Sequence, residues 1–159
     1  MTEQKFHVGV KALVRNEAGD ILVLKANPAT FYNKKDKAHW DLPGGRINEG
    51  GGVKQTLERE LGEELGIKGK DLKIGRLFDG GISNITLRVG SEKVGLVLLV
   101  YECFIRNSKG LRLSNEHLEY KWAMPEDAVK LLAYKFAKTF IRKLEHQTVI
   151  PQGLYERGP

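Results

Sequence analysis

Short apolar runs, separated by polar or glycine-rich connections, extend along most of this chain of 159 residues. Runs rich in valine, isoleucine, leucine and aromatic residues are typical of β-strands. The first two such runs are separated by the polar segment 16–20, which predicts a β-hairpin. Residues 96–100 (LVLLV) form an unbroken apolar run, typical of a strand buried on both faces. The predicted strands are residues 6–15, 21–25, 39–42, 72–78, 82–89, 94–106 and 119–124.

Three further segments have the pattern of helices. The first covers residues 52–65, where leucines recur every fourth position and give the helix one apolar stripe. Gly66 follows it, in the position where a residue with positive φ usually ends a helix. The other two predicted helices are residues 125–132, opened by a proline, and residues 134–146.

Strands and helices interleave along the chain, which predicts an α/β fold in which helices flank a mixed β-sheet. The length suits one domain, assigned here to residues 1–150, and residues 151–159 are expected to form a flexible tail. Hydrophobic residues at 41% and charged residues at 29% are ordinary for a globular protein. The sequence therefore predicts one α/β domain with its own core.

Cysteine content and charge indicate the setting and the kind of partner. The single cysteine, Cys103, excludes a disulfide within the chain and favours a reducing, cytoplasmic location. The N-terminal residues lack the apolar core of a signal peptide, and no apolar run approaches the roughly 18 residues of a membrane span. The net charge of +6 favours anionic partners, either phosphorylated small molecules or nucleic acid.

Three carboxylates one turn apart carry the candidate chemistry. Glu60, Glu63 and Glu64 stand at i, i+3 and i+4 of the first predicted helix, where like charges repel. A bound Mg²⁺ or Mn²⁺ would offset that repulsion, because both ions prefer oxygen ligands. A solvated acidic helix face is the alternative. Arg59, which can hold a carboxylate, and the glycine-rich stretch 44–52 upstream favour the metal site.

The residues around this helix resemble the box of the Nudix hydrolases. That pattern is Gly, five residues, Glu, seven residues, then Arg-Glu-aliphatic-x-Glu-Glu-x-Gly-aliphatic. Gly45 matches the first glycine, and residues 59–67 (RELGEELGI) match every specified position of the second half. The lead-in at 40–45 (WDLPGG) is also similar to the family's. The departure is at the first glutamate, where this chain has Gly51. The resemblance implies a Nudix-type α/β/α sandwich in a single domain.

By this resemblance, the reaction is the Mg²⁺- or Mn²⁺-dependent hydrolysis of the diphosphate linkage in a nucleoside diphosphate joined to another moiety. The metal ligands would be Glu60, Glu63 and Glu64, with Arg59 assisting, and either Glu60 or Glu63 would take the proton of the attacking water. A fourth carboxylate would come from a downstream loop. Glu116 is the first choice for it and Glu119 the second.

Other positions have weaker predicted roles. Gly44 and Gly45 are expected to contact the phosphates, and so is Arg46, although an ordinary surface arginine is an equal alternative. In the polar insertion, an aromatic ring of Phe31 or Tyr32 could stack on a nucleobase or simply pin the loop to the core. Neither His39 nor His117 has a second ligand at zinc spacing.

The sequence narrows the class of substrate only slightly. Residues 82–85 (ISNI) lack the proline of ADP-ribose hydrolases and the tyrosine of dinucleoside polyphosphate hydrolases, and residues 116–122 are similar to hydrolases of nucleoside or pterin triphosphates. A triphosphate substrate is therefore weakly favoured. The alternative function, supported by Gly51 and the charge, is a nucleotide- or RNA-binding module without turnover. The family also makes a homodimer possible.

Overall fold

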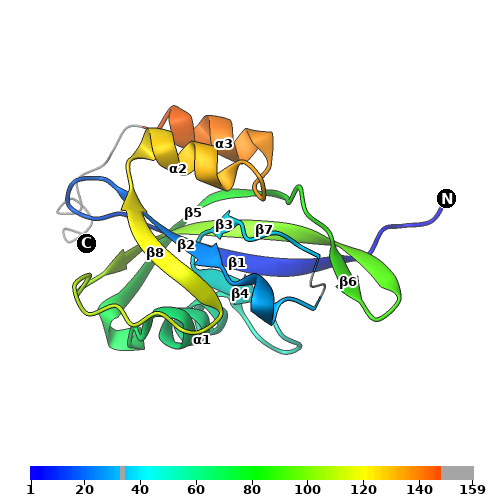
Figure 1. Ribbon diagram of the computed structural model, residues 1–159, viewed down its shortest axis with the longest axis horizontal. Helices are drawn as coiled ribbons and strands as arrows, with labels where there is room; N and C mark the ends of the chain where they lie inside the picture. The colour runs from blue at the N-terminus through cyan, green and yellow to red at the C-terminus, as the bar shows by residue number, and fades with distance from the viewer. Residues whose placement is uncertain (33–34, 148–159) are drawn as a thin grey trace.

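Two β-sheets lie between helix α1 on one side and helices α2 and α3 on the other (Figure 1). The computed structural model describes residues 1–32 and 35–147, so the predicted tail at 151–159 lies outside the described residues. One sheet has the order β4-β1-β7-β5, with β6 added to β7, and the other has the order β3-β2-β8. The strands are β1 (Phe6–Val14), β2 (Ile21–Ala26), β3 (Trp40–Asp41), β4 (Gly44–Arg46), β5 (Leu72–Ile82), β6 (Leu87–Val89), β7 (Glu92–Ile105) and β8 (His117–Ala123).

Strand β1 is central to the larger sheet and is buried on both faces. It runs parallel to β7 along its whole length, from Phe6 opposite Gly95 to Val14 opposite Cys103, and antiparallel to β4. Leu13 faces the core under α2 and α3, whereas its neighbours in the strand face the core under α1. The apolar run 96–100 of β7 is buried or half-buried throughout, as its composition predicts.

The predicted hairpin between the first two strands is wrong. The turn exists, because the Asn16 N–H donates to the Asp20 carbonyl and Gly19 has φ 85°, but only one bridge, between Arg15 and Ile21, joins the strands. Beyond it the chains diverge into different sheets, and β2 pairs antiparallel with β8 and β3. Both strands are apolar on both faces, so two full sheet partners bury them better than one hairpin.

Helix α1 (Val53–Leu65) matches its prediction. Leu57, Leu61 and Leu65 are fully buried against β1 and β2. Gly66 closes the helix in the left-handed conformation, at φ 69°, and its N–H donates to the Gly62 carbonyl. A glycine adopts that conformation at no steric cost, which fixes the end of the helix.

Helices α2 (Pro125–Leu132) and α3 (Lys138–Glu145) cover the opposite face (Figure 1). The predicted helix 134–146 begins later than expected, because residues 133–136 form a turn and a bend that are held by hydrogen bonds from the loop after strand β5. The predicted strand 82–89 is also wrong in part: Ile82 ends β5 and only Leu87–Val89 forms β6. None of the helices within residues 1–32 and 35–147 combines the length and apolar composition needed to cross a bilayer.

Candidate active site

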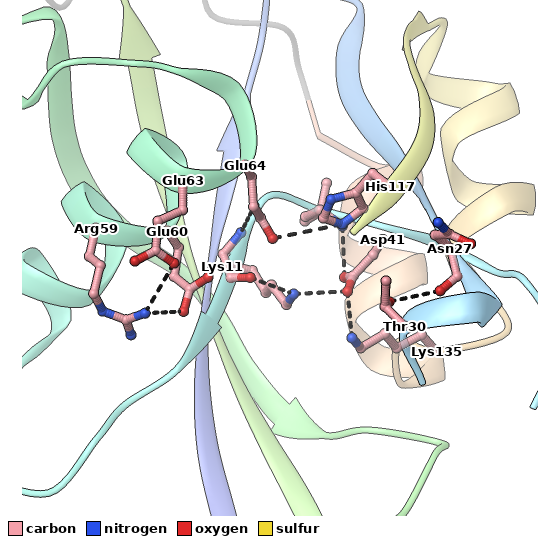
Figure 2. Close-up of polar contacts among 12 residues, drawn as sticks. Lys11, Asn27, Thr30, Asp41, Arg59, Glu60, Glu63, Glu64, His117 and Lys135 are labelled. Carbon is pink, nitrogen blue, oxygen red and sulfur yellow. Dashed lines mark hydrogen bonds and ion pairs between the residues drawn. The ribbon is translucent and has the colours of Figure 1, made fainter. Parts of the chain in front are cut away.

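The leucine stripe of α1 points into the core, so its carboxylates lie along the flank of the helix next to strand β4. The Glu63 side chain is 61% exposed, Glu60 is 14% exposed and Glu64 is only 5% exposed. Three identical side chains within five residues therefore sit in three different environments. Figure 2 shows them with the groups that they contact.

Arg59 holds two of these carboxylates together. Its Nη1 donates to Glu60 Oε1 at 2.7 Å and lies 3.6 Å from Glu63 Oε2 (Figure 2). Its Nη2 donates to the Arg46 carbonyl at 3.4 Å, which ties the guanidinium to strand β4. Arg59 thus has carboxylate partners although position 51 is a glycine. One cation shared by two anions lowers their mutual repulsion and fixes their orientation.

The glycine pair at 44 and 45 lets the helix approach the strand. A Cβ on Gly45 would lie 2.2 Å from Glu60 Oε1, so the Glu60 carboxylate occupies the space of a missing side chain. Gly44 has φ 135°, and a Cβ there would lie 2.1 Å from the Val10 carbonyl oxygen. The Gly44 N–H donates to Glu64 Oε2 at 2.9 Å. Both glycines therefore position glutamates of α1.

Glu64 is a buried carboxylate with few compensating partners. Burial raises its pKa to about 8, and the charge of Lys11 and the Gly44 N–H oppose that rise. Its Oε1 lies 3.7 Å from His117 Nε2 on β8 (Figure 2). Burial, with a further contribution from Lys11, lowers the pKa of His117 to about 4, so its imidazole is neutral at pH 7. His117 Nδ1 is buried and has no hydrogen-bond partner among residues 1–32 and 35–147.

A buried line of charge continues from Glu64 toward helix α2. Lys11 Nζ donates to Asp41 Oδ2 at 2.8 Å and to the Gly44 carbonyl at 3.2 Å, and Lys135 Nζ donates to the same Asp41 oxygen (Figure 2). Burial raises the pKa of Asp41, but the two ammonium groups outweigh it and hold that pKa far below its usual range. Burial lowers the pKa of Lys135 to about 8.

These three residues were not singled out from the sequence. Lys11 is a charged residue inside an otherwise apolar strand, and Asp41 lies in the predicted strand 39–42, so each carries a signal of a buried charge. Their pairing joins residues 30 and 94 positions apart, which no local pattern reveals. Lys135 has no comparable signal, because it lies in a turn with ordinary composition.

The side chains of the remaining predicted residues have other neighbours or are exposed. Arg46 offers its carbonyl to Arg59, while its guanidinium is 3.3 Å from His7 Nδ1. Glu116 is exposed on the turn before β8, and its carbonyl accepts from the Asn27 N–H. Glu119 lies on β8, 4.0 Å from Lys25 Nζ. The turn at Glu116 is nevertheless adjacent to His117, the residue that contacts Glu64.

The donor set fits a hard divalent cation in its chemistry. Within the part of the chain that the structure describes, no three His, Cys, Asp or Glu side chains are gathered closely enough to hold an ion by themselves. Glu60 and Glu63 nonetheless present carboxylate oxygens side by side on Arg59. Mg²⁺ commonly takes one or two protein carboxylates and completes its shell with water and substrate phosphate, so this pair is sufficient as a starting set.

Comparisons with known proteins identify the family of this chain. The model of the NUDIX domain matches residues 5–144. The nucleoside triphosphatase NudI of Escherichia coli is 26% identical over 122 residues, which cover 74% of this chain and 81% of that protein. The same protein from Shigella flexneri gives the same values.

Solved structures show the same fold. The MutT protein from Methanosarcina mazei Go1 superposes with a TM-score of 0.66 at 26% identity, covering 91% of this chain and 96% of that one. An Ap4A hydrolase of C. elegans, in a binary complex, gives 0.59 at 23% identity and covers 89% and 95%. The dihydroneopterin triphosphate pyrophosphohydrolase of E. coli gives 0.60 at 16% and covers 89% and 96%. At these identities the last two show the fold alone. The family match spans nearly the whole described chain, and the chain therefore belongs to the Nudix family and is a hydrolase.

Proposed function

We propose that this hydrolase is a Mg²⁺- or Mn²⁺-dependent pyrophosphohydrolase of nucleotides, and that nucleoside triphosphates are its preferred substrates. Two observations carry the proposal together. The Glu60 carboxylate occupies the space that a side chain at position 45 would fill, and Arg59 lies close to the carboxylates of both Glu60 and Glu63. The relative NudI is named as a nucleoside triphosphatase, which supports the triphosphate class.

Each residue of the site has a separate role in this proposal. A divalent ion, when bound, would neutralise phosphate oxygens and lower the pKa of an attacking water. Glu60 and Glu63 would hold it, Glu64 would complete the set from inside, and Glu116 would add a ligand from the turn before β8. Arg59 would orient the first two carboxylates, and the Gly44–Gly45 backbone with Arg46 would face the phosphates. Either Glu60 or Glu63 would accept the proton of the water.

A binding module without turnover is the competing function, since the box lacks a carboxylate at Gly51. Its support is Gly51 together with the net charge of +6, and a glutamate at position 51 would be a partner for Arg59. That argument is weakened, because Arg59 donates to Glu60 and also lies near Glu63. All the acidic positions of the second half of the box remain, and without a bound cation they would repel nucleic acid. A reducing, cytoplasmic setting is proposed with the enzyme, because the single cysteine, Cys103, can form no disulfide within the chain.

The proposal is tested by phosphate and pyrophosphate release from a panel of nucleoside diphosphates, triphosphates and dinucleotides with Mg²⁺, with Mn²⁺, and with a chelator. Triphosphates should be cleaved fastest, and only with metal. The Glu63→Gln variant is the matched control, because an exposed side chain of the same shape should lower turnover by orders of magnitude without unfolding the protein. Micromolar binding of a nucleotide without cleavage of any panel member would replace the enzyme with the binding module.

A further inference from the structure

Three aromatic rings from three separate segments are packed in series at the end of the buried line of charge. The ring centroid of His39 lies 5.7 Å from that of Phe31 and 5.5 Å from that of Tyr134. Phe31 follows the 3₁₀ helix η1 (Pro28–Thr30), His39 precedes β3, and Tyr134 lies between α2 and α3. Burial, together with the charge of Lys135, lowers the pKa of His39 below its usual value, which favours the neutral form of the middle ring.

The segment that carries Tyr134 is held unusually firmly. Asn84 Nδ2 donates to the carbonyls of Ala133 and Phe136, at 3.0 and 2.8 Å. The carbonyl of Lys135 accepts from both Ser83 Oγ, at 2.7 Å, and the Asn84 N–H, at 2.9 Å. The loop after β5 therefore fixes the backbone on both sides of Tyr134.

The side chain next to Tyr134 adds a second anchor. Lys135 is buried and donates its ammonium to Asp41, which also binds Lys11 (Figure 2). Tyr134 itself is 56% exposed. A ring that served only to pin the loop to the core would be buried, and this one is presented to solvent on a rigid backbone. Rigid, exposed aromatic side chains are effective binding groups because little conformational entropy is lost when a ligand packs on them.

The ring series is linked to the carboxylates by short, bonded steps. His39 and Gly44 are five residues apart, which limits the distance between their Cα atoms to about 18 Å. Between them, Asp41 binds Lys135 on one side and Lys11 on the other, and Lys11 and Glu64 both bind the backbone of Gly44. The rings and the carboxylates are thus connected through one buried polar network, which holds the segments that carry them in fixed relation to each other.

We propose that Tyr134, backed by His39 and Phe31, is the stacking platform for the heterocycle of the substrate, and that it determines affinity for nucleotides over bare polyphosphates. The inference rests on the proposed nucleotide substrate and adds the residues that would recognise its base. Stacking on a ring face is available to every base, so the platform favours heterocycles as a class and does not select one of them.

Binding of non-hydrolysable nucleoside triphosphates that carry each of the four common bases, with Mg²⁺, tests the proposal by calorimetry. Tyr134→Ala should weaken binding roughly tenfold, the effect expected for loss of one base–aromatic stack. Tyr134→Phe retains the ring and should stay within about twofold of the wild type, as a surface substitution does. Inorganic tripolyphosphate, which has no heterocycle, should bind all three proteins within about twofold of each other.

Equal binding of nucleotides to the wild type and Tyr134→Ala would overturn the platform, and so would an equal loss of tripolyphosphate affinity or the absence of nucleotide binding. Folding is not a complication, because the substituted ring is exposed. The two proposals fail separately. Nucleotide binding that depends on Tyr134 without turnover would support the stacking platform and contradict the proposed pyrophosphohydrolase activity. Turnover that does not depend on Tyr134 would support the activity and contradict the platform.

Discussion

Glu64→Gln should stabilise the metal-free protein at alkaline pH while reducing its activity. The folded pKa of Glu64 is about 8, against its ordinary 4.5, because the carboxylate is buried. Between these two pH values the folded state binds a proton that the unfolded state has released, so stability falls as pH rises from 4.5 to 8. One pKa unit corresponds to about 1.36 kcal/mol, and the interval from pH 5 to pH 8 therefore costs about 4 kcal/mol.

Glutamine has the same shape, can still accept the Gly44 N–H through its amide oxygen, and does not titrate. The free energy of unfolding should be measured by urea titration with a chelator, at pH 5 and at pH 8.5, for both proteins. Relative to the wild type, the variant should gain about 4 kcal/mol between the two conditions. Glu63→Gln, at a side chain that is 61% exposed, is the control and should show no such gain.

Saturating Mg²⁺ should return most of the lost stability to the wild type at pH 8.5 and little to Glu64→Gln, because an ion that binds only the folded state stabilises it. A stability difference between Glu64→Gln and the wild type that is the same at both pH values would refute the reasoning. Glu64 would then be ionised in the folded protein at little cost in the free energy of folding. Relief of a buried, unfavourable charge would then contribute nothing to the affinity for metal.

Other substitutions test the glycines and the buried charges. Asp41→Asn removes the carboxylate that Lys11 and Lys135 share and should cost about 3–5 kcal/mol, lowering Tm by roughly 6–20 °C in a thermal melt. An unchanged Tm would contradict this prediction. Gly45→Ala places a Cβ on Glu60 and should reduce kcat/KM on the order of a hundredfold with little change in Tm; full activity would show that Glu60 does not need this seat. Gly51→Glu should raise turnover or leave it unchanged, and a large loss would show that the loop depends on glycine there.

The outcome of the Gly51→Glu substitution depends on the backbone geometry at that position. Its backbone φ lies outside the left-handed region, unlike that of Gly50 at 73°. A Cβ at Gly51 would lie 3.1 Å from the Asn48 carbonyl oxygen, a tight contact that requires this backbone to shift by a few tenths of an ångström. The backbone conformation at position 51 is therefore open to a glutamate, and Gly51→Glu tests whether the turn accommodates the Cβ and whether the new carboxylate reaches Arg59.

Local patterns were sufficient for most elements and failed where long-range pairing decides. Helix α1 and its end at Gly66 follow from leucine spacing and from the φ that glycine adopts. The hairpin prediction failed because residues 16–20 do form a turn, yet β1 and β2 each find longer partners, β7 and β8. The partner of each strand depends on how much apolar surface is buried across the whole fold, and the sequence of a turn carries no information about that burial.

The sequence by itself determined the family and the α/β architecture. It also determined the acidic helix, because helical spacing puts Glu60, Glu63 and Glu64 on neighbouring positions of one helix. Only the tertiary structure decided that these carboxylates differ: Arg59 contacts two of them, while Gly44 and His117 enclose the third. The structure alone also joined Lys11, Asp41 and Lys135 into one buried network, since burial and charge pairing depend on which distant strands meet.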